Sequence, residues 1–169
     1  MTERVETLLT EALTYSRYTT EADSAWARAL IASSHPALEV PFQPCVVMED
    51  YQPGNVTITG ASGRWRVGGV FDLMTQRFGD GEADLSRLGR MYAWEEPALA
   101  WSFIHSYRAR CPSRPGFAQR FAVYMLLDSL IIWTFCLRRD DIWWPEDYTL
   151  RAWVEDTLGV ILGQGLLNG

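Results

Sequence analysis

The pattern of apolar and polar positions divides the chain into two helical ends and a short extended middle. Residues 2–17 carry apolar side chains at helical spacing, which predicts an amphipathic helix. Thr20, followed by acidic residues, has the pattern of a helix start, and we expect this second helix to end near Pro36. From residue 82 onward the pattern is again helical. We expect four helices there, near 82–93, 95–110, 116–138 and 147–164.

The extended middle begins with a short apolar run, Cys45–Met48. Val56–Thr59 and Trp65–Phe71 are strand-like, and Gly60–Gly63 between them is a turn signal. These segments predict one small β-hairpin. The predicted fold class is therefore mainly α with a small β-hairpin, an α+β arrangement, and we expect a single domain over 1–169.

Composition and charge exclude some classes of partner. The chain has 169 residues, of which 48% are hydrophobic, and its net charge is −6. This acidic balance argues against a nucleic-acid surface, and we expect no nucleic-acid partner. The most apolar stretch, Phe121–Leu137, is interrupted by Asp128 and Ser129. Its uninterrupted pieces are shorter than the ~20 residues of a membrane span, so we expect a buried helix and no membrane partner.

The three cysteines, Cys45, Cys111 and Cys136, are scattered and form no CxxC pair. Neither a disulfide framework nor a zinc site is expected from this spacing. The pattern favours free thiols in a reducing compartment and predicts a cytoplasmic protein.

The most informative chemistry lies around the predicted hairpin. Asp50 follows the apolar run, Asn55 comes five residues later, and Asp72 ends the hairpin. A two-stranded hairpin returns the chain close to its start, so we expect these three residues at one end of it. An Asp that orients a hydroxyl, with an Asn and a second Asp as Mg²⁺ ligands, is typical of phosphoryl-transfer sites.

Two motifs carry a family resemblance. The stretch Met48–Asn55 is similar to the H-G-D-x-x-x-G-N catalytic loop of the aminoglycoside phosphotransferase and choline-kinase-like group, within the protein-kinase-like superfamily. Val70–Asp72 followed by Phe78–Ser86 resembles the metal-binding segment of that group, an apolar pair and Asp followed by G-D-P-x-x-D-L-A. The resemblance implies the helical C-terminal lobe of a kinase-like fold, with ATP and Mg²⁺ as cofactors and a small-molecule hydroxyl as acceptor.

The resemblance also implies residue roles. Asp50 is the catalytic base or hydroxyl-orienting residue, and Asn55 and Asp72 are the Mg²⁺ ligands. Gln52 stands where the group often has a second His; it can donate a hydrogen bond to a phosphate oxygen but brings no charge. Asp84 is a structural residue that braces the loop. By resemblance, the domain comprises a helical lead-in, the catalytic loop with the metal-binding hairpin, and a helical bundle, at 1–40, 45–86 and 87–169.

The chain departs from the family pattern in three ways. The leading His and Gly of the loop are Met48 and Glu49, and the second His is Gln52. The 47 residues before Met48 contain no lysine, so nothing resembles the nucleotide-gripping N-terminal lobe, which we expect to be absent from this chain. A lobe without its partner exposes apolar surface, which indicates a homo-oligomer or a partner chain. A degenerate, non-catalytic kinase-like module that acts through protein–protein or self-association is the alternative.

Three further features have two interpretations each. His105 is either a packed helix residue or a catalytic one, and its aromatic neighbours favour packing. Asp128 either faces a substrate or pairs inside the helical bundle. Trp143 and Trp144 form either a cation–π wall for a quaternary amine or a packing contact between helices or subunits.

Overall fold

The computed structural model describes residues 1–15, 17–112 and 114–163. Contacts between Cα atoms group the chain into two compact units: Met1–Val40 with Ser113–Gly169, and Pro41–Pro112. We call them the helical unit and the loop unit. The expected fold class, mainly α with a small β-hairpin, is confirmed. The expected single domain over 1–169 stays a prediction.

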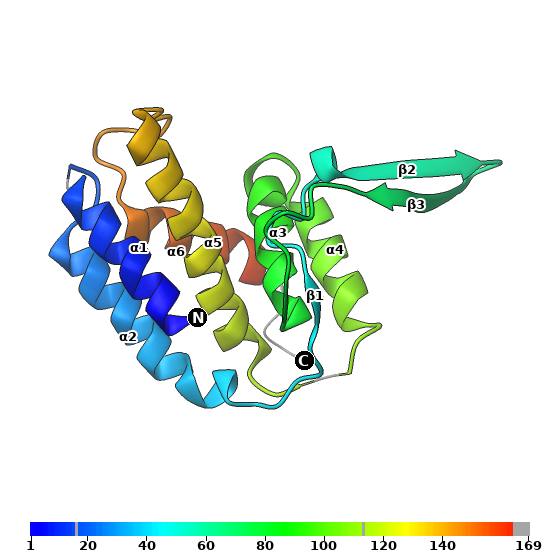
Figure 1. Ribbon diagram of the computed structural model, residues 1–169, viewed down its shortest axis with the longest axis horizontal. Coiled ribbons are helices and arrows are strands. Elements are labelled where there is room, and N and C mark those ends of the chain that lie inside the picture. Colours follow the sequence, from blue (N-terminus) through cyan, green and yellow to red (C-terminus); the bar gives the residue numbers. More distant parts are fainter. Residues whose placement is uncertain (16, 113, 164–169) are drawn as a thin grey trace. The chain divides into compact units, whose positions relative to one another are not determined.

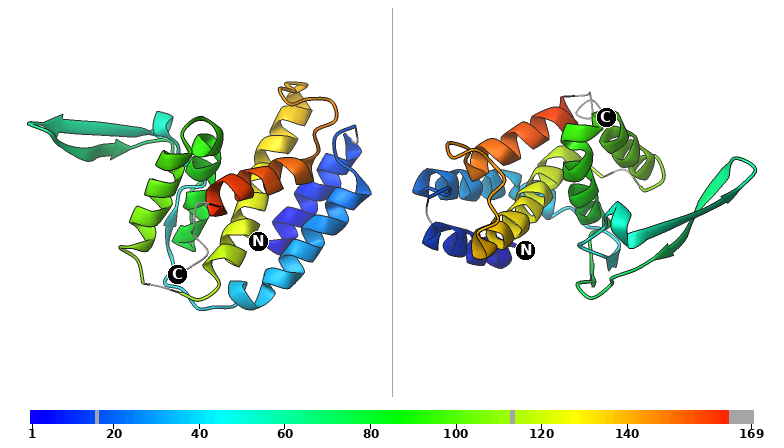
Figure 2. Two further views of the ribbon diagram at one scale, coloured as in Figure 1. Left: turned by 180° about the vertical axis from the view of Figure 1, so that it is seen from behind. Right: turned by 90° about the horizontal axis from the view of Figure 1, so that it is seen from above.

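The helical unit is built around α5 (Phe117–Arg139), which contacts α1 (Thr2–Thr14), α2 (Glu21–Leu38) and α6 (Leu150–Leu162). The views in Figures 1 and 2 agree that α1 and α2 lie alongside α5 and that α6 crosses it. Most side chains of α5 are buried, on all sides of the helix. Among the described residues, α5 is the one helix long and apolar enough to cross a membrane, yet 83% of its apolar window is buried inside the structure. Its hydrophobicity is thus accounted for by core packing.

The start of α2 follows the sequence signal. Thr20 Oγ1 accepts a hydrogen bond from the Asp23 amide, and the Asp23 carboxylate accepts one from the Thr20 amide, which completes a capping box. The predicted end near Pro36 is two residues too early, because α2 continues to Leu38. Pro36 has no backbone N–H and so removes one helical hydrogen bond. The helix tolerates this loss because Pro36 lies in its last turn. The Ala37 carbonyl in that turn accepts a hydrogen bond from Arg120 Nη1 at 3.3 Å.

The loop unit contains four short strands and two helices. The strands are β1 (Cys45–Val47), β2 (Val56–Ala61), β3 (Arg64–Val70) and β4 (Arg77–Gly79), and the helices are α3 (Asp84–Glu95) and α4 (Pro97–Arg108). β1 pairs antiparallel with β4, and β2 pairs antiparallel with β3. Single 3₁₀ turns, η1 (Pro53–Asn55) and η2 (Gly81–Ala83), lead into β2 and α3. The β1–β4 pair was not predicted.

The β2–β3 hairpin extends away from α3 and α4 within its unit (Figure 1). Its turn is made by Ser62 and Gly63 at φ +56° and +78°, the two positive φ values that a two-residue hairpin turn requires. Ile58 lies opposite Val67, and Trp65 lies opposite Gly60, where no side chain interferes with the indole ring. Alternation therefore gathers Ile58, Trp65 and Val67 on one face, and all three are exposed.

Candidate active site

The loop that carries Asp50 is held by Asp84, the first residue of α3. The two oxygens of the Asp84 carboxylate accept hydrogen bonds from the backbone amides of Met48 and Glu49, each at 2.8 Å. Burial raises the pKa of Asp84, while these two hydrogen bonds act to lower it. Thr75 Oγ1 donates to the Met48 carbonyl at 3.0 Å and ties the same residue to the segment before β4. The loop backbone is thus fixed from two sides.

Glu49 occupies a backbone conformation that favours glycine. Its φ is +64°, in the left-handed region, where a side chain other than Gly costs about 1–2 kcal/mol. The H-G-D-x-x-x-G-N motif that this loop resembles has Gly at this position. The backbone of residue 49 thus keeps a conformation that suits Gly, although the residue here is Glu. The Glu49 side chain is held by Arg77, whose Nε donates to Glu49 Oε1 at 2.5 Å. This ion pair links the loop to β4 and offsets part of the strain.

The Asp50 carboxylate is fixed by three side chains. Its Oδ2 accepts hydrogen bonds from Gln52 Nε2 and Asn55 Nδ2, both at 2.9 Å. Its Oδ1 lies 3.0 Å from Arg87 Nη1, on α3. Asn55 Nδ2 also donates to the Asp50 carbonyl at 3.0 Å. The structure therefore brings Asp50, Gln52 and Asn55 together and adds Arg87, which the sequence interpretation missed.

Asn55 and Asp72 lie at the same end of the hairpin. The Phe71 amide donates to the Asn55 carbonyl at 2.8 Å, which places Asp72 one residue beyond the position opposite Asn55. Asp72 is exposed and has a φ of +55°, a left-handed value that Asp tolerates better than most residues.

This end of the hairpin has a donor set that suits Mg²⁺. The Asn55 side-chain nitrogen donates to Asp50, so the side-chain oxygen of Asn55 is the atom left to face a cation, and the backbone of Asp72 lies at the same end of the hairpin. In the part of the chain that the structure describes, no three His, Cys, Asp or Glu side chains are grouped to hold a metal by themselves. Mg²⁺ usually takes only one or two protein carboxylates and completes its shell with phosphate and water. The residues present therefore fit a metal that arrives with a nucleotide.

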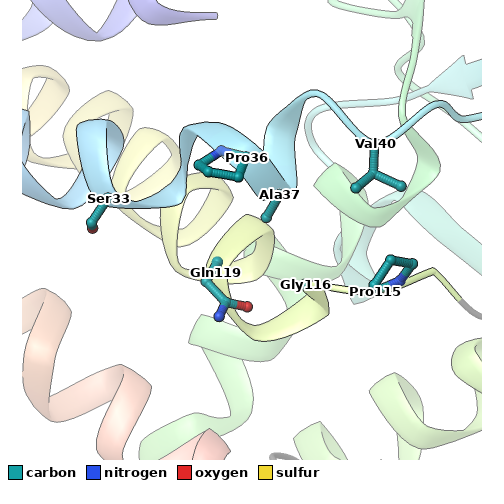
Figure 3. A pocket seen from close by; sticks show the side chains of 7 residues that line it. All are labelled: Ser33, Pro36, Ala37, Val40, Pro115, Gly116 and Gln119. Carbon is teal, nitrogen blue, oxygen red and sulfur yellow. The ribbon is translucent and has the colours of Figure 1, made fainter.

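A pocket of about 450 Å³ lies in the helical unit, where the end of α2 approaches the start of α5 (Figure 3). Gly116, at φ +78°, permits this approach, since a Cβ there would lie 2.6 Å from the Ala37 Cβ. The described part of the lining has no titratable side chain; its members are Ser33, Pro36, Ala37, Val40, Pro115, Gly116 and Gln119. Its chemistry suits an apolar contact and offers no group for proton transfer.

The tryptophan pair of the α5–α6 loop takes part in packing. Trp144 is buried and stacks on Trp133 with ring centroids 3.9 Å apart, too close for a cation to lie between the rings. Trp153 lies 5.5 Å from Trp133 and extends the cluster. Trp133 Nε1 donates to Thr19 Oγ1 at 2.8 Å. Of the two sequence interpretations, the packing contact is the one this geometry supports.

Among the described residues, the observed partners of the Asp50 carboxylate do not include His105 or Asp128, the other two residues with alternative interpretations. His105 stacks on Trp101 along α4, with ring centroids 4.8 Å apart. Asp128 is buried in the middle of α5, in the helical unit. Asp128 therefore occupies a packed position, whereas His105 is exposed on α4 and its observed contact is the stack on Trp101.

Comparison with known families matches residues 3–119 to the phosphotransferase enzyme family, abbreviated APH. The match includes α1, α2 and the whole loop unit, and it ends near the start of α5. The chain belongs to this phosphotransferase family. No curated protein and no solved structure matches it.

Proposed function

We propose that this chain is the C-terminal lobe of an ATP- and Mg²⁺-dependent phosphotransferase that acts on a hydroxyl group of a small molecule. Kinases of this family generally use ATP and Mg²⁺. The observation that carries the proposal is the fixed Asp50 carboxylate, with Asn55 and Asp72 at the adjacent end of the hairpin. Such an arrangement suits a reaction in which positioning and electrostatics supply most of the catalysis.

In the proposed reaction the acceptor hydroxyl donates a hydrogen bond to Asp50 Oδ1. The hydroxyl oxygen forms a bond to the γ-phosphorus, the bond from that phosphorus to the β–γ bridging oxygen breaks, and the hydroxyl proton passes to Asp50. Mg²⁺ held by Asn55 and Asp72 would offset the negative charge of the phosphate oxygens. Gln52 uses one amide hydrogen for Asp50 and keeps a second one for a phosphate oxygen.

The groups that bind the nucleotide in the N-terminal lobe of the resembling kinases have to come from outside the residues described above. All 15 basic residues of the chain are arginines, so the lysine that pairs with phosphates in the resembling kinases has no counterpart here. We propose that a further segment or a partner chain supplies this lobe and covers the exposed apolar face of the hairpin.

The alternative is a non-catalytic module that associates through the hairpin. Trp65 is 75% exposed and shares its face with Ile58 and Val67, while Met74, after the hairpin, is 92% exposed. A two-stranded hairpin is only marginally stable alone and is stabilised when a partner covers its apolar face. Light scattering after size exclusion tests this: Trp65→Ser should lower the oligomeric mass, and Thr59→Ser on the opposite face should not.

Calorimetric titration with Mg·ATP tests the phosphotransferase proposal. The wild-type chain should bind Mg·ATP saturably, and only when Mg²⁺ is present. Asp72→Ala should lose the Mg²⁺-dependent part of the binding, whereas Asp147→Ala, an exposed acid of the helical unit, should retain it. A wild-type chain that fails to bind at millimolar nucleotide has no independent kinase activity, and that result would favour the non-catalytic module.

A further inference from the structure

We propose that Arg87 is a positioning residue for phosphoryl transfer, which fixes Asp50 and supplies the positive charge that Gln52 does not. The inference rests on the proposed function and goes beyond the motif residues. Arg87 Nη1 lies 3.0 Å from Asp50 Oδ1, within hydrogen-bond distance. The side chain of Arg87 is 12% exposed and that of Asp50 is 27% exposed. An ion pair at this depth is screened less by water and salt than a surface pair.

The two oxygens of Asp50 have different partners. Oδ2 accepts from the neutral amides of Gln52 and Asn55, while Oδ1 faces the charged guanidinium of Arg87. The Gln52 and Asn55 side-chain amides alone would fix only Oδ2. Rotation about the Cβ–Cγ bond of Asp50 would then be restrained only by packing. Arg87 holds the second oxygen, so the plane of the carboxylate is defined by contacts at both of its ends.

The position of Arg87 in α3 links the loop backbone to its reactive side chain. Asp84, which accepts from the Met48 and Glu49 amides, begins α3, and Arg87 follows three residues later on the same face of the helix. One helical turn therefore fixes both the backbone of the loop and its carboxylate. A shift of α3 would move both together and keep Asp50 aligned with its own backbone.

The charge of Arg87 also has a role near the transferred group. A hydroxyl that donates to Asp50 Oδ1 places its oxygen about 2.7 Å from that atom, close to the guanidinium on the same Oδ1. Negative charge builds up at this place during transfer. The family's second His is Gln52 here and the chain has no lysine, and the cation found beside Asp50 is an arginine. Among the described residues, Arg87 is the one for which an ion pair with Asp50 is observed.

The first test measures position without requiring activity. NMR signals of the Asn55 and Gln52 side-chain amides, assigned with Asn55→Asp and Gln52→Glu, report the hydrogen bonds to Asp50. We expect Arg87→Gln to shift or broaden both signals, and Arg87→Lys to shift them less. Arg90→Gln, one turn further along α3, is the matched control and should leave them unchanged. Unchanged amide signals in a folded Arg87→Gln variant would overturn the proposal.

The second test measures turnover, with water as the acceptor. Phosphate release from Mg·ATP should fall at least tenfold in kcat for Arg87→Gln, with KM for ATP within about twofold of the wild type, and Arg87→Lys should recover part of kcat. Equal losses in Arg87→Gln and Arg90→Gln would refute a specific role. If the wild type neither binds nor hydrolyses Mg·ATP, the proposed function fails, and the amide signals still decide whether Arg87 positions Asp50.

Discussion

Replacement of Asp84 by Ala should release the loop that carries Asp50. The substitution removes both 2.8 Å hydrogen bonds from the Met48 and Glu49 amides to a charged acceptor. Such bonds contribute about 1.5–3 kcal/mol each, and we take the lower value because burial of Asp84 opposes its ionised form. The expected loss is about 3 kcal/mol, which corresponds to roughly a hundredfold in an opening equilibrium at 1.36 kcal/mol per factor of ten.

Amide hydrogen exchange resolved by NMR measures this loss directly. Protection at Met48 and Glu49 should fall about a hundredfold in Asp84→Ala and about tenfold in Asp84→Asn, which keeps one acceptor oxygen. Glu95→Ala, at the exposed end of the same helix, is the control and should change neither amide. Protection within twofold of wild type in Asp84→Ala would show that the carboxylate does not hold the loop.

The pH dependence gives an independent check on Asp84. Because the pKa of Asp84 is raised in the folded state, the folded chain binds more protons than the unfolded chain between the ordinary and the raised value. The part of the stability that comes from this pKa difference is therefore complete below an ordinary pKa of about 3.9 and is lost as pH rises through the folded pKa, whereas the two hydrogen bonds to the carboxylate remain. Asp84→Asn should remove this decline from the unfolding free energy measured in urea at a series of pH values.

Three further predictions concern other parts of the chain. Glu49→Gly should be more stable than Glu49→Ala by about 1 kcal/mol in urea unfolding, because both lose the Arg77 ion pair and only Gly relieves the positive φ. Trp144→Ala should lower the free energy of unfolding by about 3–5 kcal/mol. Trp143→Ala should lower it much less, because Trp143 is more than half exposed. Burial raises the pKa of Cys45, so alkylation of this thiol at pH 8 should be slower than that of a free cysteine.

Each of these three predictions has a result that contradicts it. Equal stability of Glu49→Gly and Glu49→Ala would mean that the backbone at residue 49 is not strained. Similar losses for Trp144→Ala and Trp143→Ala would contradict the buried stacking of Trp144 on Trp133. Alkylation of the exposed Cys45 at the rate of free cysteine, followed by peptide mass spectrometry, would show that the pKa of its thiol is not raised.

Local sequence signals were enough to predict the helices and the β2–β3 hairpin. The Thr20 start of α2 was visible because a capping box is a short-range pattern. The hairpin was visible because Ser62 and Gly63 lie between two strand-like segments. These features depend on residues close together in the chain, so periodicity and turn chemistry reveal them.

Long-range features were not predictable in the same way. β1 and β4 are three residues each and pair across the whole hairpin, so neither carries enough alternation to identify its partner. Arg87 looks like one of many charges on a helix surface until the fold places it beside Asp50. The sequence signal for Arg87 was its spacing of three residues from Asp84, which places both on one face of a helix. This spacing indicates a role near the loop only when Asp84 is known to hold the loop.

The order of the two units along the chain has a consequence for synthesis on the ribosome. The loop unit is one continuous segment, Pro41–Pro112, whereas the helical unit joins residues on both sides of it. During synthesis the loop unit is complete before α5 is made. The helices α1 and α2 are made first, but they cannot bury their apolar faces until α5, the helix they pack against, has been synthesised. We therefore expect the Asp50 loop to assemble first, and the apolar faces of α1 and α2 to need protection from aggregation until α5 emerges.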